Sequence, residues 1–244
     1  MTTLIFTILY IVLVFNGTVF ATGYKLLQSF PVGVEELSGL TYDPQTDTLW
    51  TVQDGGGGLY QLDKQGKVLK TISIPSNDLE GIAYKPLSDT FLLAEERNRE
   101  ILEIDRQGTI LQTIKVPLKY RFWHLNHGIE GVCHDPKSRH IFIVNEKSPR
   151  VVMELDEGGV VVKSFEVEEV EDLSGIYYDN TSGHLLVLSH ETKAVIEFTP
   201  VGKFISAFFI NAPQAEGITM DGDGNIYIIC EKSKTLYIYT PIKK

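Results

Sequence analysis

Two sets of acidic side chains recur along the chain at positions where their carboxylates could share a cation. In the first set an acid stands directly before a glycine, and its members are Glu80, Glu130 and Glu216. In the second set the acid follows an apolar run, and its members are Asp54, Glu96, Glu146 and Glu231. Carboxylates held close together repel and raise one another's pKa. Seven of them in one place therefore require protons, basic partners or a bound cation.

A divalent cation, above all Ca²⁺, fits the first set best. Calcium takes about six to eight oxygen ligands at about 2.3–2.6 Å. The three glutamates of the first set have no basic neighbour in sequence, and the glycine beside each lets backbones approach closely. We therefore expect these three to be the leading ligands, supplemented by Asp54 or by the glutamates of the second set. Ser38 and Ser174 stand before a glycine in two further copies and could contribute directly or through water.

An ion-pair network is the alternative way to neutralise these acids. Arg97, Lys147 and Lys232 each directly follow an acid of the second set. A ring of such pairs would be purely structural, but the same basic side chains could hold an anionic group of a ligand. His190 takes the place of the acid in the remaining copy. We expect His190 to be packed or hydrogen-bonded rather than to act as a general base, and it could also contact a ligand.

The acids belong to five repeats of one phrase, and the repeats define the elements that must position them. The phrase reads ELSGLTY, DLEGIAY, GIEGVCH, DLSGIYY and QAEGITM, beginning at residues 36, 78, 128, 172 and 214. The spacing of 42, 50, 44 and 42 residues, with strands rather than helices, indicates propeller blades. Adjacent strands of a blade run antiparallel, so the start of the first strand and the end of the second meet on one face. This brings both acidic sets together near the axis.

The fifth repeat lacks its fourth strand, and a copy of that strand stands at the other end of the chain. Residues 24–31 (YKLLQSFP) repeat the fourth-strand pattern. Closing a ring in this way removes exposed sheet edges. We therefore predict an all-β, five-bladed β-propeller whose last blade is completed by the N-terminal strand at residues 24–31.

The third repeat carries the one long insertion, residues 118–128, ahead of its first strand. The insertion therefore overhangs the acidic face, and loops on a rigid scaffold often carry binding sites. His124 and Asn126, with the aromatic residues beside them, could line a ligand pocket above the cation. Alternatively, Phe122 and Trp123 plug the mouth of the channel.

Charge and cysteine content restrict the classes of partner. The formal net charge of −10 argues against a nucleic acid, because phosphate binding needs clustered Lys and Arg, and it suits cation binding. The two cysteines provide no disulfide framework. The expected partners are a divalent cation and either an anionic small molecule or another protein, and we expect a monomer.

The N-terminal segment differs from the rest of the chain. Residues 4–15 form an uncharged apolar run that is shorter than the roughly 20 residues of a spanning helix, and Ala21 precedes a possible cleavage point. We interpret residues 1–21 as a signal peptide or membrane anchor and residues 22–244 as the propeller. Either interpretation places the propeller outside the cytoplasm, and membrane association through the N-terminus is possible.

The five phrases, with their alternation of SG and EG and with strands such as FLLAEE and IYIICE, resemble the SdiA-regulated (YjiK/CarP-type) β-propeller family. The resemblance covers residues 33–240. It implies a bacterial cell-envelope protein related to calcium-binding and phytase-like propellers, without a firmly assigned reaction. It also suggests calcium binding at Glu80, Glu130 and Glu216.

Three functions are compatible with these features. The first is a calcium-binding envelope propeller that serves as a binding or signalling scaffold. The second is a metal-assisted hydrolase of phosphoesters or lactones, in which the cation would polarise the substrate or activate water. The third is a platform for protein–protein interaction with purely structural charges. Whether the protein is an enzyme stays open.

Overall fold

The computed structural model of the protein describes residues 14–15, 18–19, 23–76, 78–116 and 128–242. Near the N-terminus, β1 (Val14–Phe15) pairs antiparallel with β2 (Thr18–Val19). The rest of the predicted leader or anchor lies outside the described residues. The same holds for most of the insertion, including His124 and Asn126. Within the described ranges no helix is long and apolar enough to cross a membrane.

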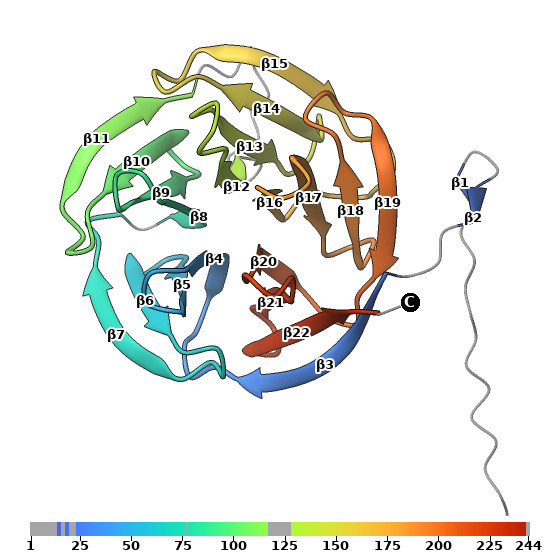
Figure 1. Ribbon diagram of the computed structural model, residues 1–244. Coiled ribbons are helices and arrows are strands. Elements are labelled where there is room, and N and C mark those ends of the chain that lie inside the picture. Colours follow the sequence, from blue (N-terminus) through green and yellow to red (C-terminus); the bar gives the residue numbers. More distant parts are fainter. Residues whose placement is uncertain (1–13, 16–17, 20–22, 77, 117–127, 243–244) are drawn as a thin grey trace, which may run out of the picture.

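Five four-stranded antiparallel sheets surround a central axis, so the predicted five-bladed β-propeller is confirmed (Figure 1). In each blade one strand lies next to the axis and one lies at the rim. From the axis to the rim the blades are β4 (Leu37–Asp43), β5 (Thr48–Gln53), β6 (Gly58–Leu62) and β7 (Val68–Ser73); β8 (Leu79–Lys85), β9 (Thr90–Glu95), β10 (Glu100–Ile104) and β11 (Ile110–Lys115); β12 (Ile129–His134), β13 (Ile141–Asn145), β14 (Val151–Leu155) and β15 (Val161–Glu166); β16 (Gly175–Asp179), β17 (His184–Ser189), β18 (Ala194–Phe198) and β19 (Phe204–Phe209); and β20 (Ala215–Met220), β21 (Ile226–Cys230), β22 (Thr235–Pro241) and β3 (Tyr24–Pro31).

The fifth blade closes as the sequence predicts. Strand β3 pairs antiparallel with β22, with Phe30 opposite Leu236 and Lys25 opposite Thr240. The first and last parts of the propeller therefore share one sheet, and the ring is held shut by backbone hydrogen bonds rather than by a loop.

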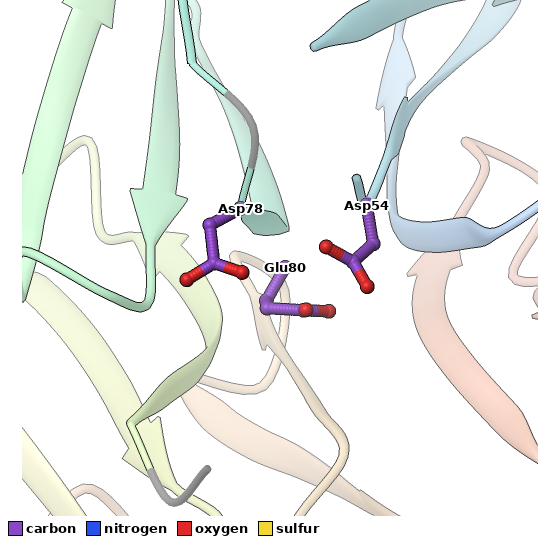
Figure 2. Close-up of side chains that lie close together, drawn as sticks. All are labelled: Asp54, Asp78 and Glu80. Atoms are coloured by element: carbon purple, nitrogen blue, oxygen red, sulfur yellow. The ribbon is translucent and has the colours of Figure 1, made fainter. Parts of the chain in front are cut away.

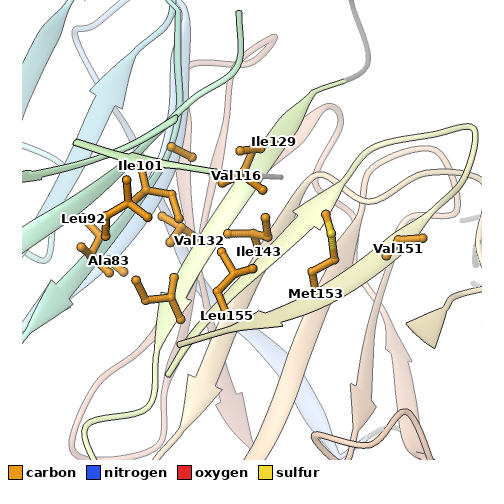
Figure 3. Packing of buried hydrophobic residues seen from close by; sticks show 13 residues of the cluster. Ala83, Leu92, Ile101, Val116, Ile129, Val132, Ile143, Val151, Met153 and Leu155 are labelled. Carbon is orange, nitrogen blue, oxygen red and sulfur yellow. The ribbon is translucent and has the colours of Figure 1, made fainter. Parts of the chain in front are cut away.

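The hydrophobic core lies between neighbouring blades. One cluster contains Leu92 and Ile101 of the second blade together with Val132, Ile143 and Leu155 of the third (Figure 3). Second strands are buried on both faces, and every residue of β9 and of β13 is buried. This explains their continuous apolar runs, because a strand covered on both sides cannot alternate with polar residues.

The inner strands approach one another closely at five glycines. These glycines, which we call the glycine waist, are Gly39, Gly81, Gly131, Gly175 and Gly217. A Cβ atom added to Gly217 would lie 2.4 Å from the carbonyl carbon of Gly39, which is far closer than real Cβ atoms come to other atoms. The cavity at this level measures only about 10 Å³. The axis is therefore nearly closed at the waist and open on either side of it.

Candidate functional site

Three glutamates of the first acidic set are each the extra residue of a β-bulge. Leu79 pairs with Glu95 and Gly81 with Ala94, so Glu80 has no partner on the neighbouring strand. The same shift in register occurs around Glu130 and around Glu216. A bulge locally re-aims side chains and is common next to functional sites. It allows a carboxylate to sit in an otherwise buried inner strand.

The bulged glutamates line a cavity of about 340 Å³ at one end of the axis, which we call the acidic chamber. The structure brings together every member of both acidic sets, along with the serines and the histidine that replace acids in the other copies. The lining residues are Glu36, Leu37, Ser38, Asp54, Asp78, Glu80, Glu96, Glu130, Glu146, Ser174, His190, Glu216 and Glu231.

Three carboxylates of the chamber come close enough to hold one metal ion. Asp54, Asp78 and Glu80 each offer an oxygen within 4.8 Å of the others, and Figure 2 shows their carboxylates gathered where the first and second blades meet. An isolated bridge pairs the backbones of Asp54 and Asp78 across these blades. In the part of the chain that the structure describes, no other three acidic, His or Cys side chains come this close.

This group overlaps only partly with the ligands favoured from the sequence. It shares Glu80 and Asp54 with them and adds Asp78, which stands two residues before Glu80. Glu130 and Glu216 line the same chamber but do not belong to the close group. The bridge that sets Asp54 beside Asp78 depends on how two blades meet, and no motif in either repeat signals it.

The electrostatics of the chamber favour protons or a cation at these acids. Burial, followed by repulsion from Asp54, raises the pKa of Glu80 to about 8, although the Ser38 hydroxyl opposes the shift. That hydroxyl donates to Glu80 Oε2 at 2.8 Å and to the Glu80 carbonyl at 2.7 Å. Burial also raises the pKa of Glu216 to about 8, and burial and the neighbouring glutamates raise the pKa of Glu130 well above its ordinary value. In the absence of a cation Glu80 and Glu216 therefore bind protons near neutral pH, and the shift at Glu130 has the same direction.

His190 is anchored at the wall of the chamber by a buried acid. Its Nδ1 lies 2.8 Å from Oδ2 of Asp172, whose side chain is fully buried, and 3.7 Å from Oε1 of Glu216. Asp172 also accepts hydrogen bonds from the Ser189 hydroxyl and, at 3.0 Å, from the Glu191 amide. Contact with Asp172 raises the pKa of His190 despite burial. His190, which was expected from the sequence to be packed or hydrogen-bonded, thus lies in an ion-pair contact with Asp172.

The basic residues do not complete a neutralising ring. Arg97 reaches Asp78 at 3.4 Å from an exposed position, and Lys147 pairs with Glu146 at 3.1 Å and with Glu191 at 2.6 Å. Lys232 is exposed, and none of the three lines the chamber. Among the described residues no lysine or arginine forms an ion pair with Glu80 or Glu130. In the described part of the chain, the ion pairs of Arg97 and Lys147 therefore do not reach Glu80 or Glu130.

Comparisons with known proteins agree with the repeat analysis. A family model described as SdiA-regulated matches residues 22–239. Among solved structures, the chain is similar to a glutaminyl cyclase of Myxococcus xanthus at 14% identity, with a TM-score of 0.69, over 90% of this chain and 97% of that one.

Two other solved structures share the fold at similar identity. A nidogen/laminin complex matches at 16% identity with a TM-score of 0.60, over 93% of this chain and 83% of that one. Virginiamycin B lyase from Staphylococcus aureus matches at 16% identity with a TM-score of 0.53, over 84% of this chain and 66% of that one. At these identities the likenesses concern the fold alone.

Proposed function

Because the chain belongs to the SdiA-regulated family, whose model matches residues 22–239, we propose that it is a calcium-binding scaffold of the cell envelope. The cation would bind in the acidic chamber at Asp54, Asp78 and Glu80. The remaining wall of the chamber would then present a ligand or a partner protein to the bound ion.

The close group of three carboxylates is the observation that supports this proposal most directly. Two ligand atoms on opposite sides of a calcium ion, each at about 2.4 Å, lie about 4.8 Å apart. The oxygens of Asp54, Asp78 and Glu80 all lie within 4.8 Å of one another. Three carboxylates supply up to six oxygens, and water or a serine hydroxyl could complete the coordination. All-oxygen ligands favour calcium over the softer transition metals.

The location outside the cytoplasm rests on the apolar run at residues 4–15. Extracellular calcium sites often bind with dissociation constants of about 10⁻⁴–10⁻³ M, because calcium is abundant there. The proposed site has three carboxylates, of which Asp78 is buried and the other two are partly buried, and it suits this weaker class. Localisation of a fluorescently tagged full chain, with and without residues 1–21, would test the assignment.

Thermal melting with calcium and with chelator tests the proposed cation. A ligand that binds only the native state stabilises it by about 2.7 kcal/mol at 100 times its dissociation constant. We expect calcium to raise the melting temperature of the wild type and to have little effect on Glu80→Gln or Asp78→Asn. Glu168→Gln removes an equal charge from an exposed site away from the chamber and should keep the full response.

A further variant, Glu130→Gln, distinguishes a site at Asp54, Asp78 and Glu80 from the site expected from the sequence. The leading ligands of that expected site are Glu80, Glu130 and Glu216. If the ion lies among Asp54, Asp78 and Glu80, this variant should still respond to calcium. If Glu130→Gln loses the response while Asp78→Asn keeps it, the ion lies nearer the axis, as the sequence favoured. Identical melting curves with calcium and with chelator, together with no metal by elemental analysis, would refute calcium binding.

A metal-assisted hydrolase is the second candidate, and the size of the chamber favours it. A cavity of about 340 Å³ exceeds what one ion and its waters require, and His190 is held at its wall by Asp172. Calcium-dependent turnover of phosphoester or lactone substrates, lost in Glu80→Gln, would establish this function. If neither phosphoester nor lactone substrates are turned over while calcium still binds, the result favours a scaffold function.

A further inference from the structure

A second cavity, of about 120 Å³, lies at the opposite ends of the inner strands, beyond the glycine waist. We call it the lower pocket. Its wall is formed by apolar residues near the axis, by four tyrosine rings, by Met220 and three prolines, and by the polar side chains of Thr41, His134 and Asn180. It shares no lining residue with the acidic chamber.

A hydrogen bond that the first two blades form in the wall of this pocket is missing in the third blade. In the first two blades a tyrosine at the end of the inner strand donates to an aspartate five residues on, from Tyr42 to Asp47 at 2.7 Å and from Tyr84 to Asp89 at 2.8 Å. In the third blade the tyrosine is replaced by His134. The aspartate five residues later is replaced by Arg139, which offers no acceptor.

His134 is consequently left without a hydrogen-bonding partner. It is 7% exposed, and neither ring nitrogen has a partner among the described residues. Burial, followed by the positive charge of Lys85, lowers the pKa of His134 to about 4, so the ring is neutral at pH 7. A buried polar group without a partner destabilises the folded state, because it gives up its hydrogen bonds to water. A polar group in this position is therefore a candidate for contact with a molecule from outside the chain.

The size and lining of the lower pocket restrict what could occupy it. An apolar cavity of about 150 Å³ can bind benzene, so a pocket of about 120 Å³ accepts one small ring and little more. The apolar walls near the axis disfavour a charged ligand, because burying an unpaired charge is costly. Neutral imidazole offers one N–H donor and one nitrogen acceptor, which match a hydroxyl or a ring nitrogen. The aromatic wall suits a planar ring, which can stack or pack edge to face.

We propose that the lower pocket binds a small uncharged aromatic molecule of single-ring size, which hydrogen-bonds to His134 through a hydroxyl or a ring nitrogen. Both ring nitrogens are buried in the structure, so the imidazole would have to turn within the wall to present one of them to the ligand. Because the glycine waist separates the two cavities, this binding does not require a cation in the acidic chamber and can be tested without one.

Titration of ¹⁵N-labelled protein with phenol, followed by NMR of the histidine ring nitrogens, tests the proposal. We expect saturable binding with a shift confined to His134. Toluene lacks the hydrogen-bonding group and benzoate carries a charge, so both should bind at least about tenfold more weakly, which corresponds to about 1.4 kcal/mol. Phenol that causes no saturable shift at His134 up to its solubility limit would overturn the proposal.

The variant His134→Tyr provides a binding-deficient protein that should still fold. It restores the residue type found in three other blades and fills the pocket with the larger side chain. We expect it to lose phenol binding and to melt at a higher temperature than the wild type. The control His184→Tyr changes a surface histidine that contacts Glu197 at 2.7 Å and should bind phenol like the wild type.

A high-resolution crystal structure of the wild type grown with phenol completes the test. Phenol in the lower pocket with its hydroxyl on His134 would support the proposal. Only water on the ring nitrogens, or phenol bound equally by His134→Tyr, would overturn it.

Discussion

Glu80, Glu130 and Glu216 occupy bulges, and this explains how acids can sit within the innermost strands. Without the extra residue, the alternation of side chains would direct each glutamate toward a neighbouring blade, where a charge has no compensation. The bulge instead faces the carboxylate toward the chamber, while the glycine that follows resumes the pairing. Each acid and the glycine after it therefore act as one structural unit.

Replacing Gly217 by alanine should destabilise the propeller. The added Cβ would lie 2.4 Å from the Gly39 carbonyl carbon and 2.6 Å from the Leu40 amide nitrogen, and both are backbone atoms that cannot move independently. Overpacking of this kind costs about 1–3 kcal/mol. Chemical denaturation should show a loss of that size. Gly33→Ala is the matched control, because nothing lies within 4 Å of its added Cβ, and it should change stability by less than about 0.5 kcal/mol.

The stability of the metal-free protein should fall as the pH rises from about 5 to about 8. The pKa of Glu216 is raised from 4.5 to about 8 by burial, so its proton binds more tightly in the native state than in the unfolded chain. The resulting stabilisation is complete below the unfolded pKa and is lost as the pH passes the native pKa. Melting temperatures measured in chelator across this range would show the decline.

The variant Glu216→Gln carries no titrating group at this position, so its decline over the same pH range should be smaller. A residual decline is expected from Glu80, whose pKa is also raised to about 8. Glu168→Gln, at an exposed site, should follow the wild type. A decline equally steep in Glu216→Gln would show that burial does not perturb this group.

The residues that line the acidic chamber can be predicted from the sequence more readily than the contacts between their carboxylates. Both acidic sets can be predicted by aligning the repeats, because equivalent positions of the blades lie at equivalent places around the axis. The closeness of Asp54 and Asp78 does not follow, because it depends on the junction between two blades that are not identical. The unpartnered state of His134 is likewise hidden, although its replacement of tyrosine can be read directly from the repeats.

At the level of elements, β3 decides whether the ring is closed. Most side chains of β3 are exposed, so β3 contributes mainly its backbone ladder with β22. Its position could be predicted because the missing strand of the last repeat and its displaced copy form a complementary pair.

A chain that begins at Gly33 and so lacks β3 should lose cooperative folding. Its fifth blade would retain three strands and would expose the ladder edge of β22 to solvent and to other chains. Circular dichroism melting should show no sharp transition, whereas a chain that begins at Gly23 should melt like the full-length protein. Adding a peptide of residues 23–32 should restore the transition by strand addition. Normal melting without β3 would contradict this role.

At the scale of the whole molecule, the outer strands at the rim determine whether one propeller associates with another. Exposed apolar side chains occur on the outer strands, among them Leu69, Leu111 and Val162. Lysines such as Lys70, Lys115 and Lys163 accompany them, and charge on an edge strand opposes pairing between molecules. Together with the net charge of −10, this supports the expectation of a monomer.

Replacing Lys70, Lys115 and Lys163 together by valine should promote association. The change leaves the blade cores untouched, so monomer stability should alter little, while the apolar outer edges could pair with those of another molecule. Light scattering should give the mass of one chain for the wild type and a larger, concentration-dependent mass for the variant. A wild type that already forms stable dimers would contradict the prediction.

The glycine waist also determines by which route solutes can enter and leave the acidic chamber. The cavity at the waist measures only about 10 Å³. The acidic chamber is therefore closed at that end and does not continue through the propeller. Anything that enters must leave by the same mouth, so entry and exit compete for one opening. A molecule held above a bound ion would block the ion's escape, and its presence would lengthen the ion's residence time without touching a single one of its ligands.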